Sequence, residues 1–154
     1  MSINHPCYTG GCNQGIVRIH LPVADICNLG CGFCERSIEN KDGIKSSKNA
    51  ISPQTAIKRL EKLIEEDNED IKVVGIAGPG EPLFSKNTFE TLKLVKKKHP
   101  ELTTCLCTNG VNLDETIDKL TNLLDYLTVT INAYTPETAK EIYKFVVFEN
   151  IQIG

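Results

Sequence analysis

Three cysteines lie close together in the segment CNLGCGFC, residues 27–34. Their spacing is C-x3-C-x2-C, and they are Cys27, Cys31 and Cys34. Thiolates on one short loop bind zinc or iron–sulfur clusters, and structural sites of both kinds usually have four protein ligands. A loop with only three thiols predicts one of two arrangements. Either a fourth ligand comes from elsewhere, such as Cys7 or Cys12, or the metal centre keeps one open coordination position.

Other segments of the chain also carry groups suited to ligand binding. The glycines of AGPGEPL, residues 77–83, allow the backbone to approach a ligand closely, although a tight turn alone would explain them. CTNG, residues 107–110, contains an Asn-Gly pair that is equally consistent with a turn. TVTINA, residues 128–133, ends another apolar segment with polar side chains. The polar residues that we expect to contact a ligand are Asn109, Thr130 and Asn132.

The elements that would position these groups alternate along the chain. Apolar and β-branched segments predict strands at 16–26, 71–77, 101–107 and 126–133. Apolar residues spaced three and four apart predict helices at 52–67, 85–100, 113–124 and 135–146. The first and the last of these helices begin with Ser52-Pro53 and Thr135-Pro136, which are typical helix starts. The tail, 146–154, is strand-like or irregular.

Alternating strands and helices predict an α/β fold with a parallel sheet and right-handed crossovers. Active sites of such folds lie at the carboxyl ends of the strands, which is where the motifs stand. About four βα units do not close a barrel of the usual size. The sequence therefore predicts an open sheet, a partial (βα) barrel completed by a second copy, or a fragment of a longer protein, and we favour the fragment.

Composition narrows the class of protein further. The chain has 154 residues, of which 40% are hydrophobic and 24% charged, as in ordinary globular domains. A net charge of -3 argues against an electrostatic nucleic-acid binder. No signal peptide or membrane-spanning run is visible, so we expect a cytoplasmic protein without a membrane partner. In that compartment seven cysteines favour metal ligands, redox groups or buried thiols over disulfides.

The cysteine loop resembles the signature of the radical S-adenosylmethionine (SAM) superfamily, including an aromatic residue, Phe33, before the last cysteine. The resemblance implies a 4Fe–4S cluster on the three cysteines, with SAM binding the remaining iron through its amino and carboxylate groups. It also implies that the glycine-rich turn takes the place of a Gly-Gly-Glu-Pro-like motif that receives the SAM amino group. The residues of that motif are Gly78, Gly80, Glu81 and Pro82.

Longer segments resemble, in order, the NifB family of nitrogenase cofactor maturases. They are HPCY, VRIHLPVADICNLGCGFCERS, VVGIAGPGEPL, TFETLKLV, TNGVNL and VTINA. The resemblance implies an enzyme that fuses substrate iron–sulfur clusters and inserts a carbide derived from SAM. It implies that His5, Cys7 and Cys105 are ligands of such a substrate cluster. It also implies three partner proteins: an electron donor, a cluster donor and a cluster acceptor or carrier.

On this basis we expect residues 1–15 to form an N-terminal cluster-ligand loop and residues 16–154 an incomplete radical SAM core. The chain departs from the family where Glu39 and Asn40 stand near the expected place of a further cysteine. Cys12 and Cys107 have no assigned role. The alternatives are a different radical SAM enzyme without the additional ligands, a non-catalytic metal-binding module, and a partial domain that folds only with a partner chain.

Overall fold

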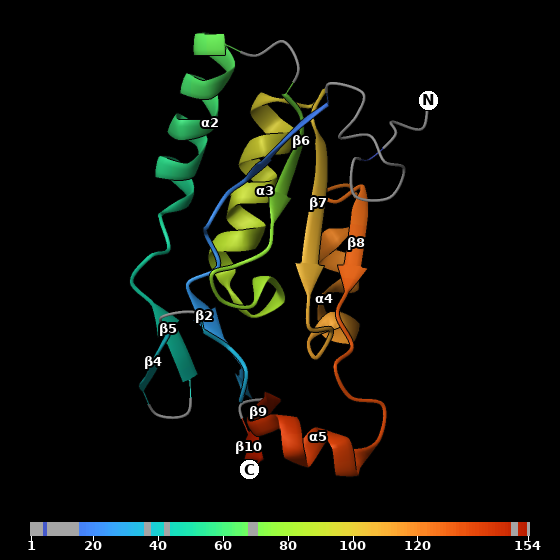
Figure 1. Cartoon of the computed structure of the whole chain (residues 1–154). Coiled ribbons are helices and arrows are strands. Elements are labelled where there is room, and N and C mark those ends of the chain that lie inside the picture. Colours follow the sequence, from blue (N-terminus) through green and yellow to red (C-terminus); the bar gives the residue numbers. More distant parts are fainter. Residues whose placement is uncertain are drawn as a thin grey trace.

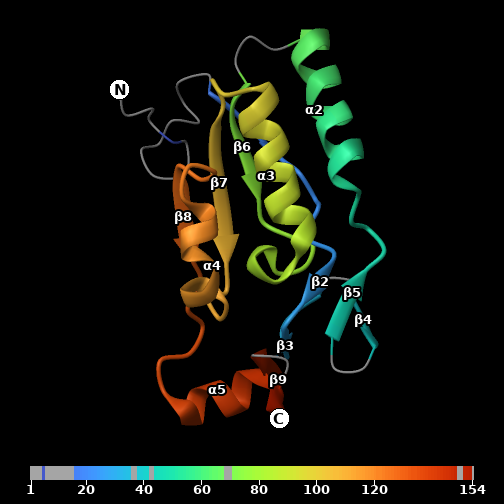
Figure 2. The same cartoon turned by 180° about the vertical axis from the view of Figure 1, so that it is seen from behind.

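A parallel four-stranded sheet is the centre of the computed structural model (Figures 1 and 2). The structure describes residues 5, 16–35, 38–41, 44–67, 71–148 and 151–153. The strand order is β1-β6-β7-β8, and each neighbouring pair is parallel. The four strands are β1 (Val17–His20), β6 (Ile71–Ile76), β7 (Thr103–Thr108) and β8 (Tyr126–Val129). This sheet confirms the predicted α/β fold of a partial (βα) barrel.

Three helices pack on one face of the sheet. They are α2 (Pro53–Asp67), α3 (Lys86–Lys98) and α4 (Leu113–Leu120), and a short 3-10 helix, η2 (Pro82–Phe84), precedes α3. Buried side chains from these helices and from the strands form one core, which includes Leu60 of α2, Leu92 of α3 and Val74 of β6. Each such side chain contributes about 1.5–3 kcal/mol when it is fully buried. The apolar spacing that predicted the helices therefore marks the face that the sheet covers.

The start of α2 follows the sequence signal at Ser52 and Pro53. The Thr55 amide donates a hydrogen bond to Ser52 Oγ at 3.2 Å, so this hydroxyl satisfies one of the amides that a helix start leaves open. Thr135 caps α5 (Pro136–Ile142) in the same way, because it accepts from the Thr138 amide at 3.2 Å. Both predicted helix starts are confirmed.

Two small antiparallel sheets lie outside the central one. One has the order β10-β9-β3 and the other β2-β5-β4. Their strands are β2 (Ile26–Cys27), β3 (Leu29–Cys31), β4 (Ile38–Lys41), β5 (Ile44–Ser47), β9 (Tyr143–Phe148) and β10 (Ile151–Ile153). In Figure 1, α5, β9 and β10 lie at the end of the molecule toward which the arrowheads of β7 and β8 point.

The structure corrects three of the predicted boundaries of strands and helices. The segment 16–26 is not one strand, because β1 ends at His20 and β2 begins at Ile26. The predicted strand 126–133 stops at Val129. The predicted helix 135–146 is wrong beyond Ile142, where β9 begins. Residues 143–148 are mostly aromatic or β-branched, and such residues favour a strand when a partner strand is available.

The contact between β9 and β3 explains why the helix ends there. Phe145 of β9 is buried, and its ring lies against Gly30 of β3. A Cβ atom on Gly30 would lie 2.6 Å from that ring, so only glycine leaves the space that the ring occupies. Tertiary packing therefore overrides the helical pattern of the preceding residues.

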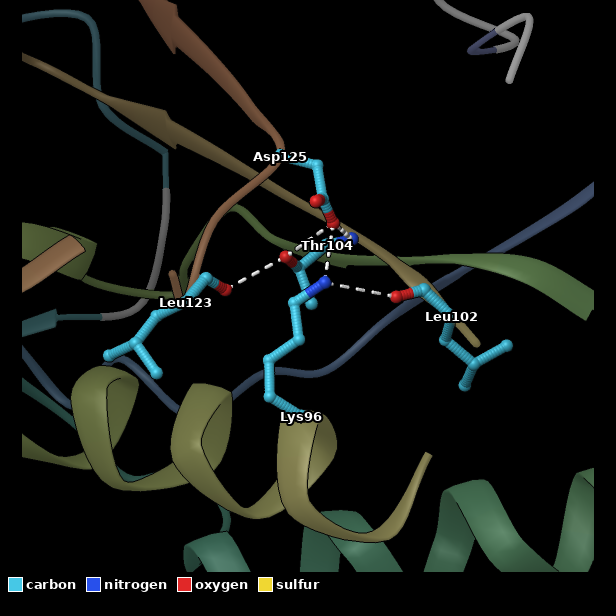
Figure 3. A network of polar contacts seen from close by, with 5 residues as sticks. All are labelled: Lys96, Leu102, Thr104, Leu123 and Asp125. Atoms are coloured by element: carbon cyan, nitrogen blue, oxygen red, sulfur yellow. Dashed lines mark hydrogen bonds and ion pairs between the residues drawn. The ribbon is translucent and has the colours of Figure 1, made fainter. Parts of the chain in front are cut away.

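A polar network joins the start of β7 to α3 and to the turn before β8 (Figure 3). Asp125 Oδ2 accepts from Lys96 Nζ at 2.6 Å and from the Thr104 amide at 2.7 Å. The Thr104 hydroxyl, which is fully buried, donates to the Leu123 carbonyl at 2.8 Å. Lys96 also donates to the Leu102 carbonyl at 3.3 Å. The network therefore fixes the start of β7 relative to α3 and to the turn before β8.

The charge of Asp125 is favoured by this network. Burial acts to raise the pKa of Asp125, but the hydrogen bonds from Lys96 and Thr104 outweigh it and lower the pKa below its ordinary value of 3.8. A lowered pKa in the fold means that the stabilisation is present above the unfolded-state pKa. It is lost as the pH falls through the folded-state pKa.

In the part of the chain that the structure describes, no helix is long and apolar enough to span a bilayer. The longest of these helices, α2, has fifteen residues and exposes charged side chains along one side. A helix needs about 20 predominantly apolar residues to cross the hydrocarbon core.

Replacing Asp125 by Ala should destabilise the fold by about 2 kcal/mol at neutral pH, because it leaves the buried Thr104 amide without its acceptor and Lys96 without its ionic partner. Urea denaturation of the two proteins measures this difference. The difference should begin to shrink as the pH falls below the ordinary Asp pKa of 3.8, where the unfolded state becomes protonated, and should be lost once the pH passes the lowered pKa of folded Asp125.

Glu66→Ala is the matched control, because it removes a carboxylate from an exposed ion pair with Lys62 on α2. Such a pair contributes about 0.5 kcal/mol or less. Equal losses in the two variants, or a difference for Asp125→Ala that does not change with pH, would contradict the role assigned to the network.

Candidate functional site

A cavity of about 560 Å³ lies at the carboxyl edge of the central sheet. It is lined by residues from the three-cysteine loop, from the turn after β6, and from the ends of β7 and β8. The sequence-predicted residues that line it are Cys27, Cys31, Phe33, Cys34, Gly80, Glu81, Pro82, Asn109, Thr130 and Asn132. Four segments that are distant in the sequence therefore meet at one place.

The three-cysteine loop is held by short strands at its start. Cys27 ends β2 and Cys31 ends β3, while Cys34 follows the turn after β3. The Gly32 amide donates to the Ile142 carbonyl at 2.8 Å, which ties the loop to the end of α5. All three cysteines are half-buried. Phe33 lines the cavity yet is 61% exposed, so its ring is available to a ligand.

The pKa of the Cys27 thiol is strongly shifted by its surroundings. Burial raises the pKa of Cys27 to about 11, and the negative charges of Glu81 and the neighbouring cysteines add to this effect. The Cys27 thiol lies 3.7 Å from the Leu29 carbonyl, to which it donates. Because a thiolate is the metal-binding form, a positively charged centre is needed to hold Cys27 deprotonated at neutral pH.

The donor set fits an iron–sulfur cluster better than a single ion. Within residues 16–35, 71–148 and the other described segments, no three His, Cys, Asp or Glu side chains converge on one point that could hold an ion. Each thiolate of a cubane binds a different iron, so its ligands need not converge as they do around zinc. The cavity volume also lies within the range of small-molecule sites.

The turn after β6 contacts the chain just before the cysteine loop. The Gly80 amide donates to the Ala24 carbonyl at 2.6 Å, and the Glu81 amide donates to the Ile26 carbonyl at 2.8 Å. A Cβ atom on Gly80 would lie 2.2 Å from the Ile26 oxygen. Only glycine allows this approach, which sets the turn directly beside Cys27.

Glu81 is a buried carboxylate, only 4% exposed, at the wall of the cavity. It accepts hydrogen bonds from the Leu83 amide at 2.9 Å, from the Asn109 amide at 2.9 Å and from the Thr108 hydroxyl. These donors hold the carboxylate in one orientation and join the turn after β6 to the end of β7. The result is a fixed negative charge that suits a cationic ligand group.

The polar residues after β8 complete the wall. The Thr130 amide donates to the Thr108 carbonyl at 2.8 Å, so the chain still follows β7 one residue past the end of β8. Asn132, which is exposed, lines the cavity two residues later. Gly78, by contrast, is not among the lining residues.

Neither His5 nor Cys105 is among the residues that line the cavity. Cys105 is buried on β7 and pairs with Gly75 on one side and Tyr126 on the other. The His5 ring contacts the Tyr126 ring, with centroids 4.8 Å apart. Burial and the charge of Arg18 lower the pKa of His5, which favours the neutral imidazole that binds metals. The structure thus brings His5 to the strand next to Cys105.

Cys107 and Thr108 are among the cavity residues to which sequence reasoning gave no role. Cys107 follows Cys105 by two positions on β7, and side chains two apart in a strand share a face. The sequence therefore contained a signal that could have indicated Cys107. Thr108 holds Glu81, which no local pattern indicates. Cys7 and Cys12 lie outside the described residues.

Comparisons with known proteins agree with this arrangement. The Radical SAM superfamily matches residues 21–151. Three curated relatives are named FeMo cofactor biosynthesis protein NifB. The Methanocaldococcus jannaschii protein is 43% identical over 151 residues, which cover 94% of this chain and 49% of that protein. The Chlorobaculum tepidum protein is 41% identical over 152 residues, covering 95% and 35%. The Klebsiella pneumoniae protein is 39% identical over 145 residues, covering 90% and 30%.

The chain spans about half the length of the Methanocaldococcus jannaschii protein and about a third of the other two. The superfamily match covers most of the chain and includes the cysteine loop, the turn after β6 and the end of β8. The fold is the partial (βα) barrel that this match implies. The chain therefore belongs to the radical SAM superfamily.

Proposed function

We propose that the chain holds a 4Fe–4S cluster on Cys27, Cys31 and Cys34 and binds SAM in the cavity beside it. The observation that carries this proposal is the meeting of the cysteine loop, the turn after β6 and the ends of β7 and β8 around one cavity. When bound, the cluster supplies the electron that cleaves SAM reductively. The protein's task is to bind and orient the reactants.

The residues of the cavity divide this task among them. Glu81 offers its fixed carboxylate to the amino group of SAM, whose positive charge it balances. Thr130 and Asn132 offer polar groups to the ribose or carboxylate oxygens. Phe33 presents an exposed aromatic ring beside Cys34, where it can cover a bound ligand and exclude water.

The finer proposal is that the chain acts in building the nitrogenase cofactor precursor, a carbide-containing iron–sulfur cluster. Its support is the 34–43% identity to proteins named FeMo cofactor biosynthesis protein NifB. In this proposal residues 1–15 form a loop that supplies His5 and Cys7 to a substrate cluster, and residues 16–154 are the radical SAM core. Cys105 is the ligand from β7. Electron donor, cluster donor and cluster acceptor proteins would be its partners.

The position of Cys105 on β7 supports the proposal that a substrate cluster binds close to SAM. Cys105 and Cys107 share one face of the strand, and Cys107 lines the SAM cavity. Residues two apart on a strand are separated by about 6.5 Å. A cluster bound near His5 and Cys105 would therefore lie within a few ångströms of the cavity, as transfer of a SAM-derived carbon requires.

Cys31→Ala should abolish the cluster, because it removes one of three thiolates from a site that has no spare ligand in its own loop. The measurement is iron and sulfide content after anaerobic reconstitution, followed by EPR spectra of the reduced protein with and without SAM. Wild-type protein should show a cluster signal that changes when SAM binds, and should release 5′-deoxyadenosine with a strong reductant.

Cys107→Ser separates an open site from a closed one, because Cys107 lines the same cavity from a neighbouring strand. A three-cysteine site predicts that this variant keeps its cluster and its response to SAM. A site closed by four thiolates, with Cys107 as the fourth, predicts that Cys31→Ala and Cys107→Ser both lose the cluster. It also predicts that the EPR signal of the wild type does not respond to SAM. Binding of zinc alone would reject the proposal, and a SAM-responsive cluster with no 5′-deoxyadenosine would favour the non-catalytic module.

Cys105→Ser tests the substrate cluster separately. The variant should bind fewer iron atoms, by on the order of four per chain, while the SAM-responsive EPR signal remains. This separation is expected because Cys105 does not line the SAM cavity. Iron counting combined with EPR is the measurement.

His5→Ala should have the same effect, since His5 lies beside Tyr126, the register partner of Cys105. Thermal unfolding of both apoproteins controls for the loss of a buried group. Wild-type iron content in both variants would mean that no substrate cluster binds here, and the different radical SAM enzyme would then be favoured.

A further inference from the structure

One polar side chain of the cysteine loop has so far no role. Asn28 follows Cys27 directly, yet it is fully buried and is not among the residues that line the cavity. A buried amide must find hydrogen-bond partners, since burying its polar groups unpaired destabilises the fold. Its partners show what the loop is attached to.

Both ends of the Asn28 amide bond to the segment between β7 and α4. Asn28 Nδ2 donates to Asn112 Oδ1 at 2.7 Å, and Asn28 Oδ1 accepts from Asn109 Nδ2 at 2.8 Å. The Asn28 backbone carbonyl accepts from the Val147 amide of β9 at 2.8 Å. The cysteine loop is therefore joined to residues more than 80 positions away in the sequence.

The Asn112 side chain bonds to Asn28 instead of capping the helix that it precedes. Asn112 is the N-cap residue of α4, where an asparagine side chain usually accepts from an amide of the first helical turn. Here the side chain makes no capping bond, and its oxygen faces Asn28 instead. The long-range bond thus replaces the local one.

Asn109 continues the connection toward the SAM cavity. Its backbone amide donates to Glu81 at 2.9 Å, and its own side chain lines the cavity. Its side-chain oxygen accepts from the Val111 amide at 3.0 Å, which fixes the orientation of its amide group. An unbroken line of hydrogen bonds therefore runs from Glu81 through Asn109 and Asn28 to Asn112.

We propose that Asn28 is a positioning residue: its amide sets the place of the cysteine loop relative to Glu81 and Asn109, and so the place of the cluster relative to SAM. The inference rests on the proposed function. A leucine has a similar branched shape, but it would leave Asn112 Oδ1 and Asn109 Nδ2 without this partner. Directional bonds, unlike apolar packing, specify one register between the two loops.

Asn28→Asp tests this contact, because it keeps the shape of the side chain and replaces the Nδ2 donor by an oxygen. It also adds a negative charge, which the matched control below adds as well. An oxygen would then face Asn112 Oδ1 in place of a hydrogen bond. The cysteines are unchanged, so the iron content after anaerobic reconstitution should equal that of the wild type. The dissociation constant of SAM, measured by EPR titration, should rise on the order of tenfold, which corresponds to about 1.4 kcal/mol.

Asn49→Asp is the matched control, since it makes the same chemical change in an exposed turn between β5 and α2. It should leave the iron content, the melting temperature and the SAM dissociation constant unchanged. Asn112→Ser removes the acceptor from the other end of the contact. Serine is also a good N-cap, so α4 should still begin at the same place.

The outcomes separate this inference from the proposed function. Weaker SAM binding in Asn28→Asp and Asn112→Ser, with wild-type iron content and apoprotein melting temperatures, supports the positioning role. An unchanged SAM affinity in Asn112→Ser overturns the positioning role. A lower iron content and a lower melting temperature in Asn28→Asp, without weaker SAM binding in Asn112→Ser, also overturn it. If wild-type protein holds no SAM-responsive cluster, the proposed function fails and this inference fails with it.

Discussion

The close approach of Gly80 to the chain ahead of Cys27 is the constraint on which the site depends. Two loops that are more than 50 residues apart in the sequence touch there through their backbones, with the Gly80 amide 2.6 Å from the Ala24 oxygen. Backbone contacts of this kind do not depend on side-chain rotamers, so they fix the distance between the two loops. The cysteines and Glu81 can share one cavity only because this distance is short.

That proximity has an electrostatic consequence. Glu81 is buried as a carboxylate, and its negative charge helps to raise the pKa of Cys27 to about 11. Among the described residues that line the cavity, none is a lysine or an arginine. Deprotonating the thiols would therefore gather negative charge in a partly desolvated space. A ligand set that contains iron and the cationic SAM would balance this charge, so cluster and SAM should stabilise one another's binding.

The sequence predicted those features of the fold that depend on interactions between neighbouring residues. The capped start of α2 at Ser52 and the alternation of strands and helices follow from neighbouring residues, and the structure has both. The motifs could be placed at one edge because parallel strands end together. The helix expected over 135–146 failed because Phe145 packs on Gly30, a contact across more than 100 residues. Asn28 could not be singled out for the same reason, since its partners come from the distant turn before α4.

The two faces of β7 show how one strand serves both the fold and the site. Thr104 and Leu106 point to the side of the helices, where the Thr104 hydroxyl donates to the Leu123 carbonyl and Leu106 joins the core. Cys105 and Cys107 alternate with them and point to the opposite face. A shift of β7 by one residue would exchange the two sets, burying thiols among leucines and removing both from the ligand side. The network at the start of β7 therefore matters for the site as well as for stability, because it holds the register that places the core residues on one face and the cysteines on the other.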